Sequence, residues 1–366
     1  MLRKACFYIR PDSVLLNNQF FIAGTIGNKM KSDAYALVAL KAELLKYDID
    51  LSTQDINPPE KSDLVFCMDQ PHHISELNKK KNQIWCLIIS EPVIYCPESW
   101  NTANHVSFDY VFTYNKHLVD NKKYFHYTFA IDTDYFLFPE PVTEELYNRR
   151  KLCTFVSSAM QGMPDRNNSN SLLFTRYEAV KWFGTNYPAD FDFYGSSFKK
   201  NVFHWSFKGV SLFRKSIPQK LFFFLARIKQ RKLIRVYGGT LAPTKKIETI
   251  KNYNFYLCYE NISGVNGYLT EKIFDCFYSS CVPVYWGAED IEELIPYNCY
   301  INGADFNDFE SLYKYIKNMP FDTYSEYVKE AQLFLRSQYF KKFTVTSFVE
   351  DIISPIKNTI CEHTNF

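Results

Sequence analysis

The sequence predicts an α/β fold built from two parallel β-sheets that are covered by helices. Short, strongly apolar runs alternate with polar spacers of helix length in the first 140 residues, and a second series follows residue 150. Such alternation is typical of parallel sheets, whose strands are buried on both faces and connected through helices. With 366 residues, the chain is long enough for two domains, each with its own hydrophobic core.

The first Rossmann-like domain is predicted over residues 1–140. Asp33–Leu45, with the sequence DAYALVALKAELL, has the apolar spacing of an amphipathic helix. The other apolar runs have strand length, and most of the spacers between them are long enough for crossover helices. The expected strands are Cys6–Ile9, Asp63–Met68, Ile84–Ile89 and Tyr110–Tyr114.

The first domain has one prominent carboxylate at a predicted strand end. Ser90, Glu91 and Pro92 follow the apolar run that ends at Ile89. In open parallel sheets the ligand binds beyond the carboxyl ends of the strands, so a glutamate there faces the ligand crevice and can serve as a general base. The alternative interpretation is a loop glutamate before a turn-forming proline. Glu98 is the nearest competing carboxylate.

Residues 141–150 are predicted to form the hinge between the domains. The surrounding sequence, FPEPVTEELYNRR, combines two prolines with charges of both signs between apolar segments. The second Rossmann-like domain is then expected over residues 151–345, followed by a helical tail at 346–366 that is broken at Pro355. The first elements of this domain are expected to be strands at 153–158 and 191–195 and a helix at 172–183.

The stretch from Tyr253 to Trp286 is predicted to be a β-α-β unit. An aromatic and apolar run at 255–259 precedes a polar loop with two glycines, and VPVYW at 282–286 returns as a second strand. Thr270 is expected to cap the connecting helix. The apolar positions of that helix are Ile273, Phe274 and Phe277.

The predicted start of this helix carries a glutamate followed at once by a lysine. In β-α-β units, an anionic group of the ligand lies near the N-terminus of the crossover helix. The carboxylate of Glu271 can accept hydrogen bonds from a ribose diol while the ammonium of Lys272 neutralises a diphosphate. The alternative is a solvated ion pair on a surface helix.

The segment YENISGVNGYLTEKIFDCFYSSCVPVYWG, residues 259–287, resembles the signature of the α-1,3/1,4-fucosyltransferase family. That signature combines an aromatic-Glu-Asn, a Tyr-x-Thr-Glu-Lys and a Val-Pro-Val followed by glycine. The departures are Tyr259, where phenylalanine is more usual, and Cys281, where glycine is common. The resemblance implies a GT-B architecture, in which two Rossmann-like domains face each other across a cleft, and a protein of the soluble bacterial or viral type.

The resemblance also implies an inverting transfer of L-fucose from GDP-β-L-fucose to a glycan hydroxyl, expected at O3 of GlcNAc or Glc, with Glu91 as the catalytic base. The family's Glu-Ser-Pro motif is altered here, because no residue separates Glu91 from Pro92. No cofactor is expected to be required, and stimulation by a divalent cation is left open. The residues expected to bind the donor are Arg176, Glu260, Asn261, Tyr268, Glu271 and Lys272.

Two alternatives to this activity stay open. One is a transferase of the same framework that uses a different nucleotide sugar. The other is a catalytically inactive relative that binds glycans or nucleotides. Only a measurement of turnover separates these alternatives from the fucosyltransferase hypothesis.

Charge and composition limit the partners. The 42 basic and 40 acidic residues nearly balance, which argues against a dedicated nucleic-acid-binding protein. Residues 199–235 form an insertion with eleven basic residues, interleaved aromatic residues and no acidic residue. We expect this insertion to contact a membrane surface or an acidic, lipid-linked acceptor glycan, and a solvated hairpin is the alternative.

The remaining features predict an intracellular protein without a metal site. The sequence has no apolar segment of the roughly 18 residues that a membrane span needs, and its N-terminal apolar run is too short for a signal peptide. We therefore expect a cytoplasmic location, with peripheral association at the inner face of a membrane as the alternative. The 10 cysteines are expected to be reduced core residues. The Asp-x-Asp triplets at 48/50, 132/134 and 190/192 match a metal signature of the other large glycosyltransferase fold, but they are a weak signal that is expected by chance in a chain with this many acidic residues. The seven histidines, including the adjacent His72 and His73, do not have the spacing of metal ligands.

Overall fold

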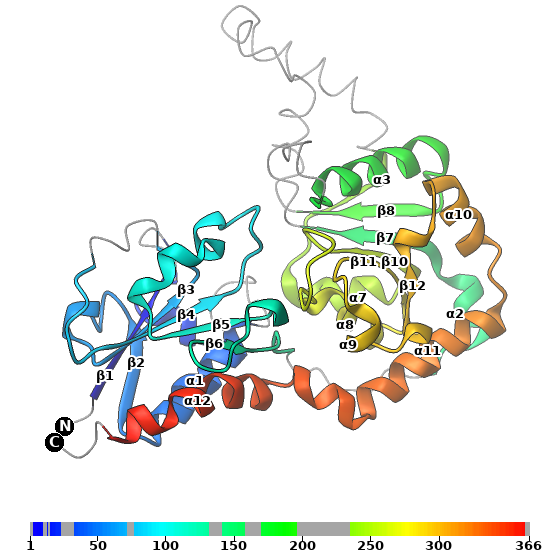
Figure 1. Ribbon diagram of the computed structural model, residues 1–366. Coiled ribbons are helices and arrows are strands. Elements are labelled where there is room, and N and C mark those ends of the chain that lie inside the picture. Colours follow the sequence, from blue (N-terminus) through cyan, green and yellow to red (C-terminus); the bar gives the residue numbers. More distant parts are fainter. Residues whose placement is uncertain are drawn as a thin grey trace, which may run out of the picture.

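The structure is a computed structural model that describes residues 3–9, 13, 15–22, 33–71, 77–131, 141–157, 170–195 and 235–362. The predicted insertion at 199–235 lies outside these ranges apart from Arg235. The Asp132/Asp134 triplet and the His72–His73 pair also lie outside them. The described residues form two lobes, each built around a parallel sheet (Figure 1).

The sheet of the first lobe has the order β2-β1-β3-β4-β5-β6 in the described residues, and all its pairings are parallel. Strand β4 lies inside the sheet, and all six of its residues are buried. This burial on both faces explains why the apolar run at this position is uninterrupted. The strands are β1 (Arg3–Tyr8), β2 (Ile49–Thr53), β3 (Leu64–Met68), β4 (Ile84–Ile89), β5 (Tyr110–Thr113) and β6 (Tyr124–His126).

Helix α1 (Asp33–Leu45) has the limits that its sequence predicts, and it packs against α12 (Val345–Glu362) from the far end of the chain (Figure 1). The predicted break at Pro355 is wrong, because α12 continues through this proline. A proline inside a helix removes one backbone hydrogen bond. Apolar burial on either side offsets that loss, since Ile352 and Ile356 are completely buried in the same core as Leu40.

The sheet of the second lobe has the order β12-β11-β10-β7-β8-β9 in the described residues, again with parallel pairings. Strand β10 lies inside it, and all seven of its residues are buried. The pairing of β10 with β11 and the helix between them confirm the predicted β-α-β unit. The strands are β7 (Lys151–Val156), β8 (Phe191–Tyr194), β9 (Tyr237–Gly239), β10 (Tyr253–Tyr259), β11 (Val282–Trp286) and β12 (Ile301–Asn302).

Helices cover both lobes. The α-helices of the described residues other than α1 and α12 are α2 (Glu144–Arg149), α3 (Leu173–Asn186), α7 (Lys246–Ile250), α8 (Glu271–Tyr278), α9 (Ile291–Leu294), α10 (Phe309–Lys317) and α11 (Phe321–Arg336). Short 3-10 helices occupy Gln19–Phe21, Pro59–Lys61, Pro97–Trp100, Thr102–Ser107, Lys116–Leu118, Pro243–Lys245, Tyr297–Cys299, Gly303–Asp305 and Gln338–Phe343. Helix α2 lies in the segment predicted as a hinge, and the hinge role and the domain boundaries stay predictions.

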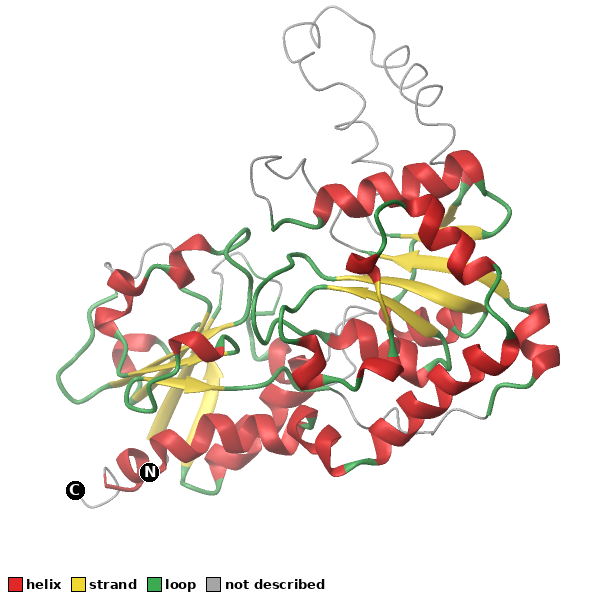
Figure 2. Cartoon of the chain, turned by 45° about the vertical axis from the view of Figure 1, so that its right-hand side comes forward, coloured by secondary structure: helices red, strands yellow, loops and turns green. Residues whose placement is uncertain are grey.

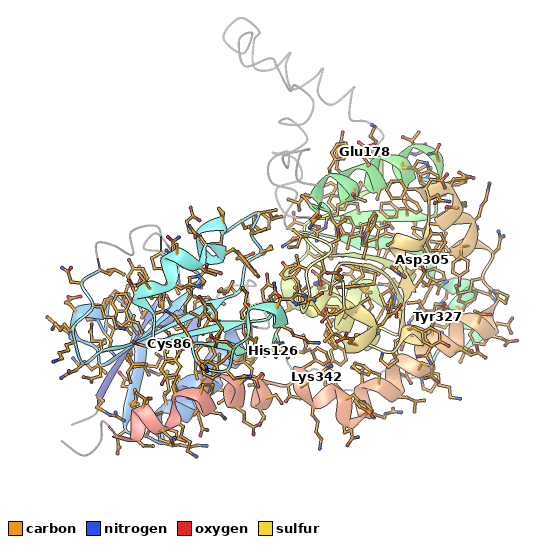
Figure 3. All side chains as sticks on the ribbon, viewed as in Figure 1. Cys86, His126, Glu178, Asp305, Tyr327 and Lys342 are labelled. Carbon is orange, nitrogen blue, oxygen red and sulfur yellow. The ribbon has the colours of Figure 1, made fainter. Side chains whose placement is uncertain are left out.

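Contacts join the two lobes on the side where loops of both lie between the sheets (Figure 2). The rings of Tyr114, which follows β5, and Tyr268 have centroids 5.3 Å apart. Lys116 forms an ion pair with Asp290, whose side chain is 7% exposed, at 3.2 Å. Near this junction lie His126 and Lys342 (Figure 3). Burial, Lys116 and Lys342 lower the pKa of His126.

Candidate functional site

The candidate site is formed by loops at the carboxyl ends of strands in both sheets. Glu91 follows β4, whereas Glu260 and Asn261 follow β10. Glu271 is the first residue of α8. Because the carboxyl ends of parallel strands lie at one edge of a sheet, each sheet brings its polar loop residues together at that edge. The structure thus collects the side chains that the sequence nominated for donor binding at one edge of the second sheet.

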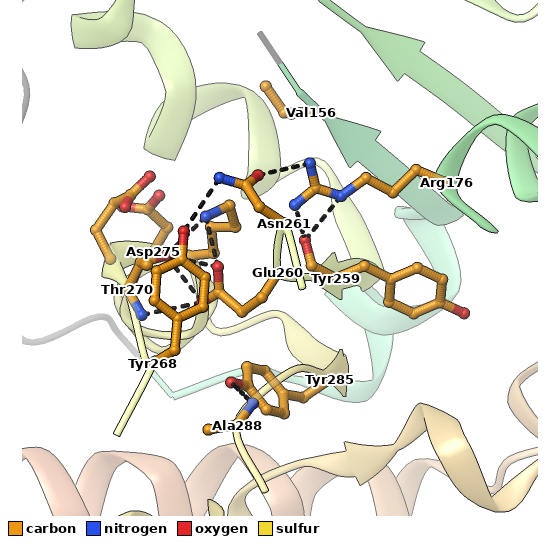
Figure 4. Close-up of polar contacts among 12 residues, drawn as sticks. Val156, Arg176, Tyr259, Glu260, Asn261, Tyr268, Thr270, Asp275, Tyr285 and Ala288 are labelled. Atoms are coloured by element: carbon orange, nitrogen blue, oxygen red, sulfur yellow. Dashed lines mark hydrogen bonds and ion pairs between the residues drawn. The ribbon is translucent and has the colours of Figure 1, made fainter. Parts of the chain in front are cut away.

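Glu260 is a completely buried carboxylate at the centre of this edge (Figure 4). It accepts hydrogen bonds from the backbone N–H of Thr270 at 2.9 Å and from the hydroxyl of Thr270 at 2.8 Å. Lys272 donates to it through Nζ at 2.7 Å. Thr270 occupies the N-cap position of α8 as predicted, but its hydroxyl bonds Glu260 and makes no capping hydrogen bond.

Arg176 approaches the same edge from α3 and is 1% exposed. Its Nε donates to the carbonyl oxygen of Tyr259 at 3.1 Å, its Nη2 donates to the same oxygen, and its Nη1 donates to Oδ1 of Asn261 at 2.9 Å. Asn261 in turn donates through Nδ2 to the Tyr268 hydroxyl at 3.1 Å, and Figure 4 shows this row of contacts. Burial lowers the pKa of Arg176, and Glu260 opposes that effect.

The burial of Arg176 follows from its position on α3. Ala179, Val180 and Phe183 lie three, four and seven residues further along and are completely buried. In a helix, residues with this spacing share one face, so the arginine lies on the same buried face of α3 as its apolar neighbours. A guanidinium in such a place requires hydrogen-bond acceptors, and the ends of β10 provide them.

Glu271 belongs to a second cluster of charges around Lys246, which lies in α7. Nζ of Lys246 is 3.2 Å from Oε1 of Glu271 and also forms an ion pair with Oδ2 of Asp275. Although burial opposes its ionisation, Lys272 and Lys246 hold the pKa of Glu271 below its ordinary value. Burial raises the pKa of Asp275 to about 6 against the influence of Lys246.

Glu91 lies on the first-lobe side of the junction and is half-buried. Its carbonyl oxygen accepts a hydrogen bond from Nε1 of Trp100 at 3.0 Å. Burial raises the pKa of Tyr268, and the charges of Glu260 and Glu91 both add to the increase. Burial also raises the pKa of Tyr95, on which Arg176 and Glu91 act with opposite signs. Glu91 is therefore close enough to the second lobe to share electrostatic partners with its buried ionic residues.

Comparison with known proteins identifies the second half of the chain. Residues 199–362 match the profile of the C-terminal domain of glycosyltransferase family 10, the fucosyltransferases. This match covers slightly less than half of the chain, from residue 199 onward.

Fucosyltransferases from bacteria, plants and animals are similar to a part of the chain. An α-(1,3)-fucosyltransferase, FucT, from Helicobacter pylori is 39% identical over 86 residues, which are 22% of this chain and 18% of that protein. An α-(1,4)-fucosyltransferase from Arabidopsis thaliana is 36% identical over 80 residues, 21% of this chain and 20% of that protein. These alignments span about a fifth of the length of each relative.

Solved structures establish the GT-B fold for the chain as a whole. A crystal structure of an α1,3-fucosyltransferase with GDP-fucose superposes with a TM-score of 0.53 at 16% identity, over 100% of this chain and 92% of that one. An α-glucosyltransferase in complex with UDP-glucose and DNA gives 0.52 at 10% identity, over 97% and 99% of the two chains. At such identities the likeness concerns the fold alone.

Three charged residues beside the predicted site residues were not nominated from the sequence. Lys246 and Asp275 form the second cluster with Glu271, and Asp69 follows β3 beside the Glu91 loop. Asp69 had a usable signal, because it directly follows an apolar run just as Ser90-Glu91 does. Lys246 had none, since it precedes Glu271 by 25 residues and carries no motif.

The described residues carry neither a metal cluster nor a membrane-spanning helix. Within these residues there is no group of three or more His, Cys, Asp or Glu side chains that could hold a metal ion. The helices in the same part of the chain are too short or too polar to span a membrane. The cysteines in this part of the chain are free thiols, and most of them are buried.

Proposed function

We propose that the protein is an inverting fucosyltransferase that moves L-fucose from GDP-β-L-fucose to a glycan hydroxyl, at O3 of GlcNAc or Glc. The observation that carries the proposal is the gathering of cations at one sheet edge: Lys272 bonds the buried Glu260, and Arg176 bonds the adjacent Asn261. Glu91 and Glu260 both act on Tyr268 electrostatically. The match to the fucosyltransferase profile supports the choice of donor.

In the proposed donor complex, the diphosphate lies at the start of α8. Lys272, Asn261 and Tyr268 would contact it, and the helix N-terminus would add favourable backbone N–H dipoles. Arg176 would contribute a permanent positive charge from beneath. Glu260 would act through Lys272, because its own carboxylate is 0% exposed and is already occupied by Thr270 and Lys272.

The ribose is proposed to bind Glu271. Its side chain is 38% exposed, so part of the carboxylate faces solvent while Oε1 lies beside Lys246. An ionised carboxylate accepts hydrogen bonds from both hydroxyls of a diol. The two lysines that keep the pKa of Glu271 low support this ionised state at neutral pH.

The reaction proposed is a single displacement. The acceptor oxygen forms a bond to the anomeric carbon of fucose while the bond from that carbon to the β-phosphate oxygen of GDP breaks. Glu91 takes the proton of the acceptor hydroxyl, and GDP leaves with the bonding electron pair. One displacement inverts the β-linked donor to an α-fucoside. Arg176, Lys272 and the start of α8 would stabilise the negative charge that develops on the leaving diphosphate.

Incubation with GDP-fucose and a panel of N-acetyllactosamine-type and lipopolysaccharide-type acceptors, followed by mass spectrometry, tests the activity. We expect a mass gain of one deoxyhexose and release of GDP. A parallel screen of GDP- and UDP-sugars with the same acceptors, in which release of GDP or UDP is measured, tests the donor. Turnover confined to a UDP-sugar would contradict the proposal.

The variant Glu91→Gln tests the proposed base. Glutamine has nearly the same shape but cannot accept the proton, so we expect GDP binding to persist and transfer to fall roughly 10²- to 10⁴-fold. Glu98→Gln serves as the control, because Glu98 was the competing carboxylate. Unchanged turnover in Glu91→Gln would remove this residue from the mechanism.

We further propose that residues 199–235 bring the enzyme to the inner face of a membrane that carries an acidic, lipid-linked acceptor. Eleven basic residues without one acidic residue support electrostatic attraction to anionic lipid. Flotation with vesicles of phosphatidylglycerol and phosphatidylcholine tests this proposal. Binding should weaken as salt is raised or as the anionic lipid is omitted, and binding that ignores both would contradict it.

A further inference from the structure

A buried aspartate holds the loop that carries Glu91. Asp69 follows β3, is 9% exposed and has a positive φ of 57°, a conformation that aspartate and asparagine adopt more readily than most residues. Its backbone N–H donates to the carbonyl oxygen of Ile88 at 2.9 Å. Because β3 and β4 are paired with Met68 opposite Ile88, the chain continues from Asp69 directly beside Ser90.

The carboxylate of Asp69 accepts four hydrogen bonds from its surroundings. Oδ1 accepts the backbone N–H of Ser90 at 2.9 Å and that of Glu91 at 3.1 Å. Oδ2 accepts the hydroxyl of Ser90 at 2.6 Å and also the backbone N–H of Glu91 at 3.3 Å. Two of these groups can only donate, which is the environment of an ionised carboxylate.

The carbonyl groups of the same loop are held from the other side. Nε1 of Trp100 donates to the carbonyl oxygen of Glu91 at 3.0 Å, and the hydroxyl of Tyr127 donates to that of Ile89 at 2.8 Å. Asp69 supplies the complementary restraint on the N–H groups. The peptide that carries Glu91 is thus fixed in both of its hydrogen-bonding directions.

We propose that Asp69 is a positioning residue that aims the Glu91 carboxylate at the acceptor hydroxyl, an inference that rests on the proposed role of Glu91 as base. A general base works only when it is held within hydrogen-bond range of the proton it removes, and a misplacement of about 1 Å costs roughly 10²-fold in rate. Rigid support through backbone hydrogen bonds meets this requirement without using the carboxylate itself.

Three variants separate positioning from general stability. Asp69→Gly removes the acceptor at no backbone cost, because glycine favours a φ of 57°. Asp69→Asn keeps the shape and the Oδ1 acceptor. Asp120→Gly is the matched control, because Oδ1 of Asp120 likewise accepts backbone N–H groups, here from residues 122, 123 and 124. This loop precedes β6 and therefore lies at the amino ends of the strands, away from Glu91.

Hydrogen–deuterium exchange tests the restraint without any assay of activity. In Asp69→Gly the amides of residues 90 and 91 should exchange at least tenfold faster than in the wild type, whereas Asp69→Asn should change them little. Asp120→Gly should accelerate exchange only at 122–124. Wild-type protection of residues 90 and 91 in Asp69→Gly would overturn the proposal.

Steady-state kinetics test the consequence. Asp69→Gly should lower kcat roughly 10²-fold with the KM for GDP-fucose nearly unchanged, and Asp69→Asn should recover most of kcat. The double variant Asp69→Gly/Glu91→Gln should be no slower than Glu91→Gln alone, because a positioning residue acts through the base. Independent, multiplicative losses, or full activity of Asp69→Gly, would refute the inference.

The two hypotheses fail in different ways. Full turnover in Glu91→Gln would contradict the proposed role of Glu91 as base, whatever the Asp69 variants do. If Glu91→Gln is inactive but Asp69→Gly is fully active, only the positioning role of Asp69 is contradicted. If Asp69→Gly does not fold, Asp69→Ala takes its place, because alanine also removes the acceptor: faster exchange at residues 90 and 91 and a lower kcat support the proposal, and wild-type values of both overturn it.

Discussion

Replacement of Lys246 by methionine removes the cation that joins Glu271 and Asp275. Methionine fills a similar volume, so the change chiefly deletes a charge. The side chains of Lys246 and Asp275 are 20% and 13% exposed, and loss of one partner of a buried pair costs about 3 to 5 kcal/mol. The two carboxylates also stand four residues apart on α8, where like charges repel. We therefore expect a marked fall in thermal stability.

The same change should weaken nucleotide binding. Without Lys246 the carboxylate of Glu271 loses its restraint, and a hydrogen bond to a charged group is worth about 1.5 to 3 kcal/mol. Such a loss corresponds to a roughly 10- to 100-fold weaker affinity. Calorimetric titration with GDP and with 2′,3′-dideoxy-GDP measures it. The wild type should prefer GDP, and Lys246→Met should lose most of this preference.

Lys245→Met provides the matched control. Lys245 is the preceding residue and pairs with Glu248, but the side chains of this pair are 64% and 68% exposed. Exposed pairs contribute about 0 to 1 kcal/mol, so stability and GDP affinity should hardly change. Adding Asp275→Asn to Lys246→Met should restore part of the stability and leave the affinity low. Wild-type GDP affinity in Lys246→Met would refute the proposed ribose contact or its dependence on Lys246.

Two further predictions concern the loop at the junction of the lobes and helix α12. In Gly267→Ala the new Cβ would lie 2.0 Å from the carbonyl oxygen of Tyr114, so the loop must shift and kcat should fall at least tenfold. The control Gly264→Ala has a similar φ of +68°, but its nearest neighbour lies 3.7 Å away, so backbone strain should lower its stability by only about 1 kcal/mol. Equal activities of the two variants would contradict this reasoning. Burial, chiefly, raises the pKa of Asp351 to about 6 from 3.8, so the native protein binds a proton more tightly than the unfolded chain, and its stability falls as the pH rises through this window. Asp351→Asn should therefore stabilise by about 1 to 2 kcal/mol above pH 6, after allowance for solvent screening, and bring no gain near pH 4; a gain that is independent of pH in thermal melts would exclude this origin.

The sequence predicts best those elements whose burial is complete. Ile84–Ile89 and Val282–Trp286 are found with the predicted limits, because strands inside a parallel sheet need apolar side chains on both faces. Helix Asp33–Leu45 is also found as predicted. The strands that were not predicted, β2, β6 and β9, lie at the edges of the sheets. An edge strand contains polar residues and is short, as in the IDLST of β2, so its local pattern is weak.

For the site, too, a short sequence motif located some residues, whereas their partners depend on contacts between segments that are far apart in the sequence. The resemblance to a family motif located Arg176, Asn261 and Lys272, and the structure brings them to one sheet edge. What the motif does not reveal is which residue is the partner of each charge. Lys246 meets Glu271 only because α7 packs on α8, and Thr270 turns its hydroxyl to Glu260 only because that carboxylate is buried beneath it.

The buried position of Glu260 explains why a glutamate belongs in the signature even though it has no exposed surface. Two cations held close together beneath a diphosphate repel each other, and a lysine in such a place tends to lose its proton. A carboxylate that bonds Lys272 directly and acts on Arg176 through space offsets this repulsion before the donor binds. The same carboxylate fixes the direction of the lysine, since Thr270 holds it in turn. We therefore expect Glu260→Gln to impair diphosphate binding through Lys272 rather than through a lost contact with the donor, so that the loss should be larger for GDP than for guanosine.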